Sequence, residues 1–362
     1  MRVHLLAIPN CQTTKAHYLD GFCQMNIRFA TLLKRLGHEV ILYASEENDA
    51  PCDVLVNCLS KAKMAEFVGQ TPYQAVDYNA NTPLFIHFNA VAAGMLTHYK
   101  QPGDLIASIG GSAHMPIAAQ HPEVPFLEYS VGYRGILLTG SHRIYQSHAW
   151  RHVVHGYTGV DGGREFDDVI PPFFEADEFP FTNYPKDYVV YLGRIVTRKG
   201  IVTAVEAAKL AGVPLKVMGF GDTPLVTHGE YVGTPDPVER NAILSQARAI
   251  LVPTQYIEPF GNVVAEAQLC GVPVISTNYG GFVESVEHGV TGFRCASVGA
   301  FAQAIRDVES LDRTTIRARA RRLYSMEAAA GAYTAYFERL SPLGLTGLTV
   351  PPPPASQELM HV

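Results

Sequence analysis

Short β-type segments alternate with helical segments from the first residues of this 362-residue chain onward. Residues 3–8 and 38–44 are apolar runs that predict strands. Between them, apolar residues from Phe22 to Leu36 recur every three or four positions, as in an amphipathic helix that ends at Gly37. Strands that alternate with helices pair in parallel, so the chain is restricted to α/β folds whose helices cover both faces of a parallel sheet.

The same alternation runs through two successive stretches of the chain. In the first stretch, further strands are predicted at 54–57, 84–88, 105–109, 125–129 and 136–139. Residues 169–178 are acidic and interrupted by proline, as linkers between domains are. Beyond them, strands are predicted at 188–193, 215–219, 230–232, 249–253 and 273–276. We therefore expect two Rossmann-like, doubly wound parallel-sheet domains that face each other across a cleft.

The expected division of the chain has four parts. The first domain covers residues 1–170 and the second covers residues 171–325. A helical segment begins near residue 312, carries a run of arginines that predicts a solvated face, and ends near residue 340. We expect its last part, 326–340, to pack back toward the first domain. The tail 341–362 contains four consecutive prolines, which predict a flexible segment.

Composition narrows the class of protein. With 47% hydrophobic and 17% charged residues the chain can bury large cores, which excludes global disorder. A net charge of −6 disfavours a nucleic-acid binder, although a basic groove needs only a few local charges. No apolar run reaches the ~20 residues that span a bilayer, and the amino terminus does not resemble a signal peptide. The six cysteines form no CxxC pair, so we expect reduced thiols and a cytoplasmic protein.

Residues 252–271 contain the most informative pattern. Glu258 lies in a loop after a predicted strand, and a helix begins near Gly261 and Asn262. Glycine and asparagine leave backbone N–H groups accessible at the positive end of the helix dipole, which predicts an anion site. Glu266 follows in the second turn. Two carboxylates beside an anion site repel each other unless they bind neutral hydroxyls, such as those of a ribose or a sugar, at about 1.5–3 kcal/mol per charge-assisted bond.

Basic residues follow another predicted strand. Arg194 comes directly after the strand at 188–193, and Lys199 lies five residues further on, before a helix. Cations at the carboxyl end of a strand in an acidic protein are suited to bind a diphosphate, whose developing charge they would stabilise during a reaction. Histidines at 142, 148, 152 and 155 lack the HExxH spacing and a nearby carboxylate, so we expect a partly buried helix and no metal site there.

These patterns together resemble a known family. The spacing of Glu258 and Glu266 resembles the E-x7-E motif of retaining glycosyltransferases with the GT-B fold. Four other stretches resemble the remaining elements of that family in the same order: VIPPFF (169–174), YLGRIVTRKG (191–200), MGFGD (218–222) and PVISTNYGGFVE (273–284). Residues 169–340 are thus similar to glycosyltransferase family 4.

The resemblance implies roles for the second domain, which would bind a nucleoside diphosphate sugar, UDP- or GDP-linked, without a metal or other cofactor. Arg194 and Lys199 would hold the diphosphate, Glu258 would contact the hydroxyls of the transferred sugar, and Glu266 would accept hydrogen bonds from the ribose. The remaining donor-binding candidates are the backbone groups of Phe260, Gly261, Asn262 and Val263, Gly219 of the MGFGD element, and Tyr231, Val232 and Gly233 where the base would lie.

The first domain, which the resemblance makes the acceptor domain, departs from the family pattern. The loop after its first strand lacks the usual glycines, and the strand at 125–129 is followed by no histidine. Six residues remain as candidates for the acceptor site: Asp20, Gly21, His114, Glu128, Tyr129 and Tyr133.

The predicted activity is transfer of a hexosyl or pentosyl group, with retention, from a nucleoside diphosphate sugar to a hydroxyl acceptor. The acceptor class stays open between a glycan, a lipid, a protein, a small molecule and a modified DNA base, with nucleic acid disfavoured by the net charge. Two alternatives use the same fold: a nucleotide-sugar epimerase, which would form product without an acceptor, and a non-catalytic subunit that binds a nucleotide sugar.

Overall fold

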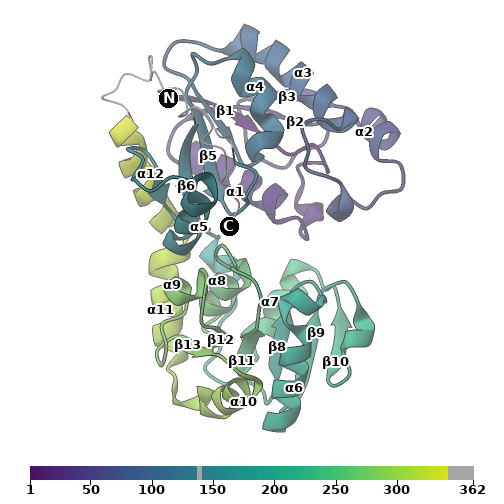
Figure 1. The fold of residues 1–362 in the computed structure, drawn as a ribbon, viewed down its shortest axis with the longest axis vertical. Helices are drawn as coiled ribbons and strands as arrows, with labels where there is room; N and C mark the ends of the chain where they lie inside the picture. The colour runs from purple at the N-terminus through teal and green to yellow at the C-terminus, as the bar shows by residue number, and fades with distance from the viewer. Residues whose placement is uncertain (137–140, 341–362) are drawn as a thin grey trace. The chain divides into compact units, whose positions relative to one another are not determined.

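The computed structural model describes residues 1–136 and 141–340, which form two α/β units, each with its own sheet (Figure 1). The first unit comprises Met1–Ile144, Arg164–Asp168 and the chain from Tyr333 onward, and the second comprises Tyr145–Gly163 and Val169–Ala332. Two doubly wound units are therefore confirmed. The tail expected at 341–362 and most of the strand expected at 136–139 lie outside the described residues.

The first unit is built on a seven-stranded sheet in the order β3-β2-β1-β4-β5-β6-β7. Its strands are β1 (Arg2–Leu6), β2 (Glu39–Ser45), β3 (Val54–Leu59), β4 (Leu105–Ser108), β5 (Phe126–Val131), β6 (Ser141–Tyr145) and β7 (Asp168–Val169). Strands β1 to β5 pair in parallel. The order reverses direction between β1 and β4, which is the point where doubly wound sheets bind ligands.

Four α-helices belong to the described part of the first unit: α1 (Gly21–Arg35), α2 (Lys61–Val68), α3 (Pro83–Tyr99) and α4 (Met115–Gln120). The strand predicted at 84–88 is wrong, because those residues lie in α3. Thr82 caps this helix by accepting from the N–H of Phe85, and Pro83 occupies its first position. These start signals decide in favour of a helix where the short apolar run alone suits either structure.

The second unit has a six-stranded sheet in the order β10-β9-β8-β11-β12-β13, and all neighbouring strands are parallel. Its strands are β8 (Val189–Leu192), β9 (Leu215–Met218), β10 (Glu230–Gly233), β11 (Ala249–Val252), β12 (Val274–Thr277) and β13 (Gly292–Cys295). The five strands predicted here are confirmed. β13 was not predicted, because its glycine and arginine hide the apolar pattern.

The helices of the second unit are α5 (His148–Thr158), α6 (Ile201–Ala211), α7 (Pro237–Ser245), α8 (Asn262–Leu269), α9 (Phe282–Ser285), α10 (Val298–Asp307) and α11 (Arg313–Tyr324), with the first part of α12 (Met326–Leu340). Alternate residues of the strands enter two cores. Val189 and Leu251 pack with α6 and α10 on one face, while Val190 and Ile250 pack with α8 and α11 on the other. The sheet is thus covered on both faces.

The helical segment expected from 312 to 340 is two helices. The chain turns at Ser325, whose ψ of 161° is extended, between α11 and α12. The expectation of a solvated arginine face fails at Arg313, which is buried and donates hydrogen bonds to the carbonyls of Thr182, Ser245 and Ala247. An arginine that binds backbone carbonyls ties α11 to the loops beneath it, which charge patterning alone does not reveal.

Candidate functional site

Loops from three strands meet at the carboxyl edge of the second sheet. Residues 193–200 follow β8, residues 219–222 follow β9, and residues 253–261 follow β11. Strands β8 and β11 are neighbours at the point where the strand order reverses direction. Ligands of open α/β sheets bind in the crevice at this point, so the loop placement alone marks the edge as the candidate site.

The start of α8 presents a row of backbone donors. Gly261, with φ of 85°, stands before the helix, and no side chain caps it. Within the described residues, the N–H groups of Phe260, Gly261, Asn262 and Val263 have no hydrogen-bond acceptor. Phe260 itself is buried and packs edge-on against Tyr324, with ring centroids 5.4 Å apart. These four donors lie at the positive end of the helix, where the glycine and asparagine predict an anion site.

Lys199 and Glu258 are brought together, although 59 residues separate them in the sequence. The Lys199 Nζ lies 2.7 Å from a carboxylate oxygen of Glu258, and both side chains are partly exposed. The ring of Tyr256 lies beneath two cations, 4.4 Å from the guanidinium carbon of Arg198 and 5.1 Å from Lys199 Nζ. Burial and the Glu258 carboxylate raise the pKa of Tyr256, so this phenol stays neutral.

Arg194 lies at the carboxyl end of β8 and is exposed. Its carbonyl accepts a hydrogen bond of 2.7 Å from the buried Tyr191 hydroxyl, which fixes the backbone there. Among the described residues its guanidinium has no ion-pair partner. Lys199 is therefore held by Glu258, whereas Arg194 is available to an incoming anion.

The paired glycines of the NYGGFVE stretch support the Glu258 loop. The N–H of Gly281 donates to the carbonyl of Glu258 over 2.8 Å. A Cβ on Gly280 would lie 2.9 Å from the backbone N and O of Glu258, and one on Gly281 would lie 2.6 Å from the carbonyl oxygen of Pro259. Only glycine permits the two loops to approach this closely. The stretch therefore supports the backbone of the loop that carries Glu258.

Glu266 is buried in α8, close to a cation of the neighbouring helix α7. A guanidinium nitrogen of Arg240, on α7, lies 3.8 Å from its carboxylate. Arg240 also donates to the side-chain carbonyl of Asn241, its neighbour. Sequence analysis missed Arg240, because a single arginine on a polar helix carries no signal until the fold places it beside Glu266.

The residues expected to lie near the base form a second group at the ends of β9 and β10. The N–H of Gly219 donates to the carbonyl of Gly233 over 2.7 Å, and the Gly219 carbonyl accepts from the Tyr231 hydroxyl over 3.0 Å. Tyr231 is 44% exposed, whereas Val232 packs partly against the core. The backbone of Gly219 is thus engaged within the protein, and the exposed Tyr231 ring is the surface that a base could stack on.

In the first unit, the predicted residues at the start of α1 are tied together. Asp20 caps the helix by accepting from the N–H of Cys23 over 2.8 Å. It also accepts from Asn10 over 2.9 Å and from the Tyr78 hydroxyl over 3.0 Å. Gly21 is exposed beside it. The Asp20 carboxylate is buried and satisfied, so its structural role as a helix cap is already filled.

Glu128 and Tyr129 are fully buried in β5. Glu128 accepts from Ser141 over 2.7 Å and pairs with the buried Arg143 at 3.3 Å. Tyr129 stacks on Phe29 with ring centroids 4.0 Å apart, and its hydroxyl accepts from Asn26. The expectation that these two side chains point into a ligand site is therefore wrong, because both are enclosed by the core. Tyr133, which donates to Glu128 over 3.3 Å, is only half-buried.

His114 is enclosed at the carboxyl end of β4. Its Nδ1 shares a 2.7 Å hydrogen bond with the Ser108 hydroxyl, and its ring packs against Phe88 and Phe85. Burial lowers the pKa of His114 to about 3, so the ring is neutral at physiological pH. Four of the six candidates of the first unit are therefore buried, whereas Gly21 is exposed and Tyr133 is half-buried.

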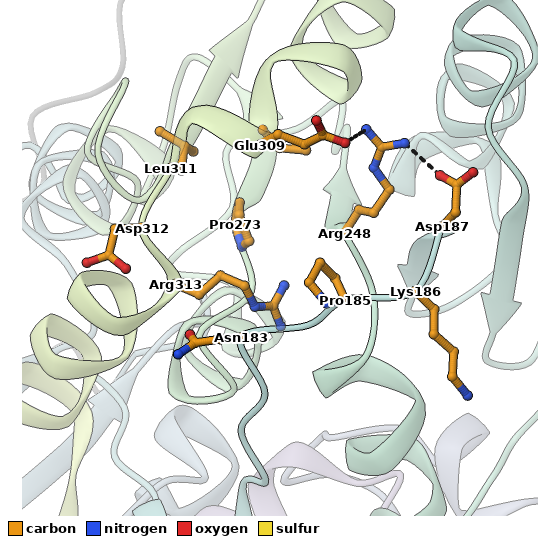
Figure 2. A pocket seen from close by; sticks show the side chains of 11 residues that line it. Asn183, Pro185, Lys186, Asp187, Arg248, Pro273, Glu309, Leu311, Asp312 and Arg313 are labelled. Atoms are coloured by element: carbon orange, nitrogen blue, oxygen red, sulfur yellow. Dashed lines mark hydrogen bonds and ion pairs between the residues drawn. The ribbon is translucent and has the colours of Figure 1, made fainter.

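A cavity of about 600 Å³ lies at the opposite edge of the second sheet (Figure 2). Asp187, Arg248 and Pro273, which line it, lie one or two residues before strands β8, β11 and β12. Figure 2 shows Arg248 between Asp187 and Glu309, at 2.6 and 2.9 Å. Arg248 is paired with both carboxylates, and the cavity lies at the amino ends of the strands, so we do not take it as the functional site.

The described residues contain no group of three or more His, Cys, Asp or Glu side chains placed to hold a metal ion. The histidine-rich segment forms strand β6 and helix α5, which packs through the buried Trp150. Over the described ranges 1–136 and 141–340, every helix is too short or too polar to cross a bilayer.

Comparison with known sequences finds a family match in part of the chain. Residues 186–310 match the family described as "Glycosyl transferases group 1". The chain is 33% identical over 138 residues to a glycogen synthase of Mycobacterium tuberculosis, which covers 33% of each chain. It is 32% identical over 176 residues to a D-inositol 3-phosphate glycosyltransferase of Mycolicibacterium paratuberculosis, covering 42% of this chain and 37% of that protein. The matches thus span about a third of the length of these relatives.

Solved structures resemble the whole described chain. AviGT4, a glycosyltransferase of avilamycin A biosynthesis, matches with a TM-score of 0.69 and 20% identity, over 94% of this chain and 97% of that one. The complex of Anabaena Alr3699/HepE with UDP matches with a TM-score of 0.64 and 16% identity, over 94% of this chain and all of the other. These likenesses confirm the GT-B fold that the sequence predicted.

Proposed function

Since residues 186–310 match the group 1 glycosyltransferase family, we propose that this chain transfers a sugar, with retention and without a metal, from a nucleoside diphosphate sugar to a hydroxyl acceptor. One observation carries the proposal: four consecutive backbone N–H groups at the start of α8 have no acceptor among the described residues, and the Lys199–Glu258 pair belongs to the loops of the same strand edge. A diphosphate-linked sugar supplies both an anion for the donors and hydroxyls for the carboxylate.

The donor would bind across the carboxyl edge of the second sheet. Phosphate oxygens would accept from the N–H groups of residues 260–263 and from Arg194, which has no ion-pair partner within the described chain. The sugar hydroxyls would donate to Glu258, and the ribose hydroxyls to Glu266. The base would stack on Tyr231, whose ring is 44% exposed. Relatives in this family include an inositol phosphate glycosyltransferase, and a structural neighbour is solved with UDP-glucose, which supports a UDP-sugar donor.

The protein would promote the transfer by stabilising the departing diphosphate. As the bond from the sugar to the phosphate breaks, negative charge develops on the phosphate oxygen. Lys199, released from Glu258 by the sugar, would then pair with that oxygen, and the positive end of α8 would add to the stabilisation. The acceptor hydroxyl would attack from the same face, and its proton would pass to the departing phosphate. This route requires no protein nucleophile, and Tyr256, neutral because its pKa is raised, offers none.

The first unit would bind the acceptor. Of its sequence-predicted candidates, Gly21 is exposed and Tyr133 is half-buried, so these two are accessible to a ligand. Asp20 would contribute by holding the start of α1. We propose no acceptor class, because the buried Glu128, Tyr129 and His114 leave no charged group in this set to select one.

The test is a thermal-shift panel of UDP- and GDP-sugars on the full chain, followed by a transfer assay with the donor that binds. A ligand at 100 times its Kd should stabilise the protein by about 2.7 kcal/mol. Glu258→Ala should lose turnover while the protein stays folded. A panel without any stabilising nucleotide sugar would refute the proposal.

The same assay separates the alternatives. An epimerase would convert the donor sugar in the absence of any acceptor. A non-catalytic subunit would bind the donor tightly and yield neither transfer nor hydrolysis. Either outcome would replace the transferase proposal while leaving the donor site in place.

A further inference from the structure

The loop that carries Glu258 is held from a second side by a residue that no motif includes. Ser147, just before α5, donates its hydroxyl to the carbonyl of Pro259 at 2.5 Å. The two residues lie 112 positions apart in the sequence and both belong to the second unit. The same Ser147 oxygen accepts from the N–H of Trp150 over 3.0 Å, so one hydroxyl both caps α5 and binds the Glu258 loop.

The position of Ser147 is fixed by Glu284. One carboxylate oxygen of Glu284 accepts from the N–H of His148 over 2.9 Å, and the other accepts from the N–H of Ala149 over 2.7 Å. A carboxylate at the positive end of a helix is favourable, and two bonds to successive amides leave it a single orientation. The indole of Trp150, buried in the first turn, keeps the helix from rotating. Glu284, Ser147 and the Pro259 carbonyl thus form a chain of contacts, which we call the α5 clamp.

The clamp controls the direction of an amide in the anion site. A peptide bond is planar, and in the trans form its C=O and N–H point in opposite directions. All described peptide bonds are trans. Because Ser147 holds the carbonyl of Pro259, the N–H of Phe260 in the same peptide unit must point away from Ser147. That N–H is the first of the four that have no acceptor within the described residues.

We propose that Ser147 and Glu284 are positioning residues that aim the Phe260 amide at the diphosphate of the donor. The inference rests on the proposed function and extends it to two side chains outside the E-x7-E and basic elements. Ser147 does not touch the ligand. It acts through the Pro259 peptide, while Gly281 holds the preceding carbonyl, that of Glu258, in the same way.

The experiment compares ligands with and without a diphosphate. Calorimetric titration of the full chain with UDP, GDP, uridine and guanosine measures the gain in affinity that the diphosphate provides. Ser147→Ala should lower the affinity for the nucleoside diphosphate about tenfold, as expected for one misdirected charge-assisted hydrogen bond, and leave nucleoside affinity unchanged. Glu284→Gln should lower the affinity for the nucleoside diphosphate by a smaller factor. Ser147→Thr keeps the hydroxyl and should restore the affinity.

A matched control separates positioning from general helix stability. Ser297 caps α10 by accepting from the N–H of Ala300 over 3.2 Å, and among the described residues its hydroxyl makes no hydrogen bond to the Glu258 loop. Ser297→Ala should lower the melting temperature about as much as Ser147→Ala without changing diphosphate affinity.

The outcomes distinguish the two proposals. A wild-type chain that binds no nucleoside diphosphate overturns the proposed function and this inference together. A wild-type chain that binds one, with Ser147→Ala equal to wild type, overturns only the α5 clamp. Equal losses for nucleoside and nucleoside diphosphate also overturn it, because they indicate a general loss of structure.

Discussion

The two sheets share one topology and differ at their carboxyl edges. In both, the strand order reverses between the first and fourth strands, β1 and β4 in one unit and β8 and β11 in the other. At the edge of the second sheet, Arg194 is exposed and four amides have no acceptor among the described residues. At the edge of the first, Asp20, Glu128 and His114 are buried and bonded to their neighbours.

Under the proposed function, this difference lets one fold serve two purposes. A strongly anionic ligand requires donors that stay unsatisfied until it arrives, and the second unit keeps them at a helix start. The first unit uses its polar groups to brace its own loops. Polar residue type alone therefore does not identify a binding residue, whereas a set of donors without internal partners does.

Among the substitutions that test this comparison, replacement of Glu128 should have the largest effect. Glu128→Ala leaves Arg143 buried without its carboxylate, which should lower the free energy of unfolding by about 3–5 kcal/mol. Chemical denaturation followed by circular dichroism measures the loss. The double variant Glu128→Leu with Arg143→Met should recover most of it. If Glu128→Ala abolished turnover at unchanged stability, Glu128 would be a catalytic residue and the comparison would break.

Lys199→Ala should lower kcat by ~10²–10³, because a cation that stabilises departing charge is lost. The measurement is transfer rate at saturating donor. Lys209→Ala, an exposed lysine on the neighbouring helix α6, is the matched control and should keep full activity. Equal rates for both variants would remove Lys199 from the proposed site.

The enclosed His114 predicts a pH dependence of stability. Its pKa is depressed to about 3 in the folded chain and is about 6.5 when unfolded, so the unfolded state binds the extra proton between these values. Stability should therefore be complete above pH 6.5 and fall by about 3 kcal/mol as the pH drops toward 4. Thermal melts of wild type, His114→Asn and the exposed control His98→Asn test this. A wild-type slope identical to that of His114→Asn would contradict it.

Glu266→Gln should produce the smallest of these changes. Losing the charge of one hydrogen-bond acceptor costs about 1.5 kcal/mol, or roughly a tenfold rise in the KM for the donor. A donor that carries deoxyribose lacks one of the ribose hydroxyls. The KM of wild type and the KM of the variant should therefore differ less for this donor. An equal difference for both donors would place Glu266 away from the ribose.

The sequence predicted the second unit better than the first, for a physical reason. The strands 188–193 and 249–253 and the helix start at Gly261 follow from local patterns, and the anion site needs only a helix terminus. By contrast, Glu128 and Tyr129 lie at the end of the strand predicted at 125–129, and no local pattern shows which way their side chains point. Only packing shows that Arg143 and Phe29 enclose them.

Long-range contacts account for most of what sequence analysis missed. Ser147 lies 112 residues from Pro259, Arg240 meets Glu266 from another helix, and Arg313 reaches carbonyls at 182, 245 and 247. None of these pairs has a local signature. The strand predicted at 84–88 was wrong for a different reason, because a five-residue apolar run fits a buried strand and a buried helix equally well.

The path of residues 145–163 has a practical consequence for dissecting the molecule. A piece cut at the linker near residue 169 would leave Ser147 and α5 behind, so the Pro259 carbonyl and the Glu284 carboxylate would both lose their partners. A recombinant second half intended for ligand screening should therefore start before Tyr145, or graft α5 onto its amino terminus. Otherwise the fragment would bind phosphate groups more weakly only because of where its boundary was placed.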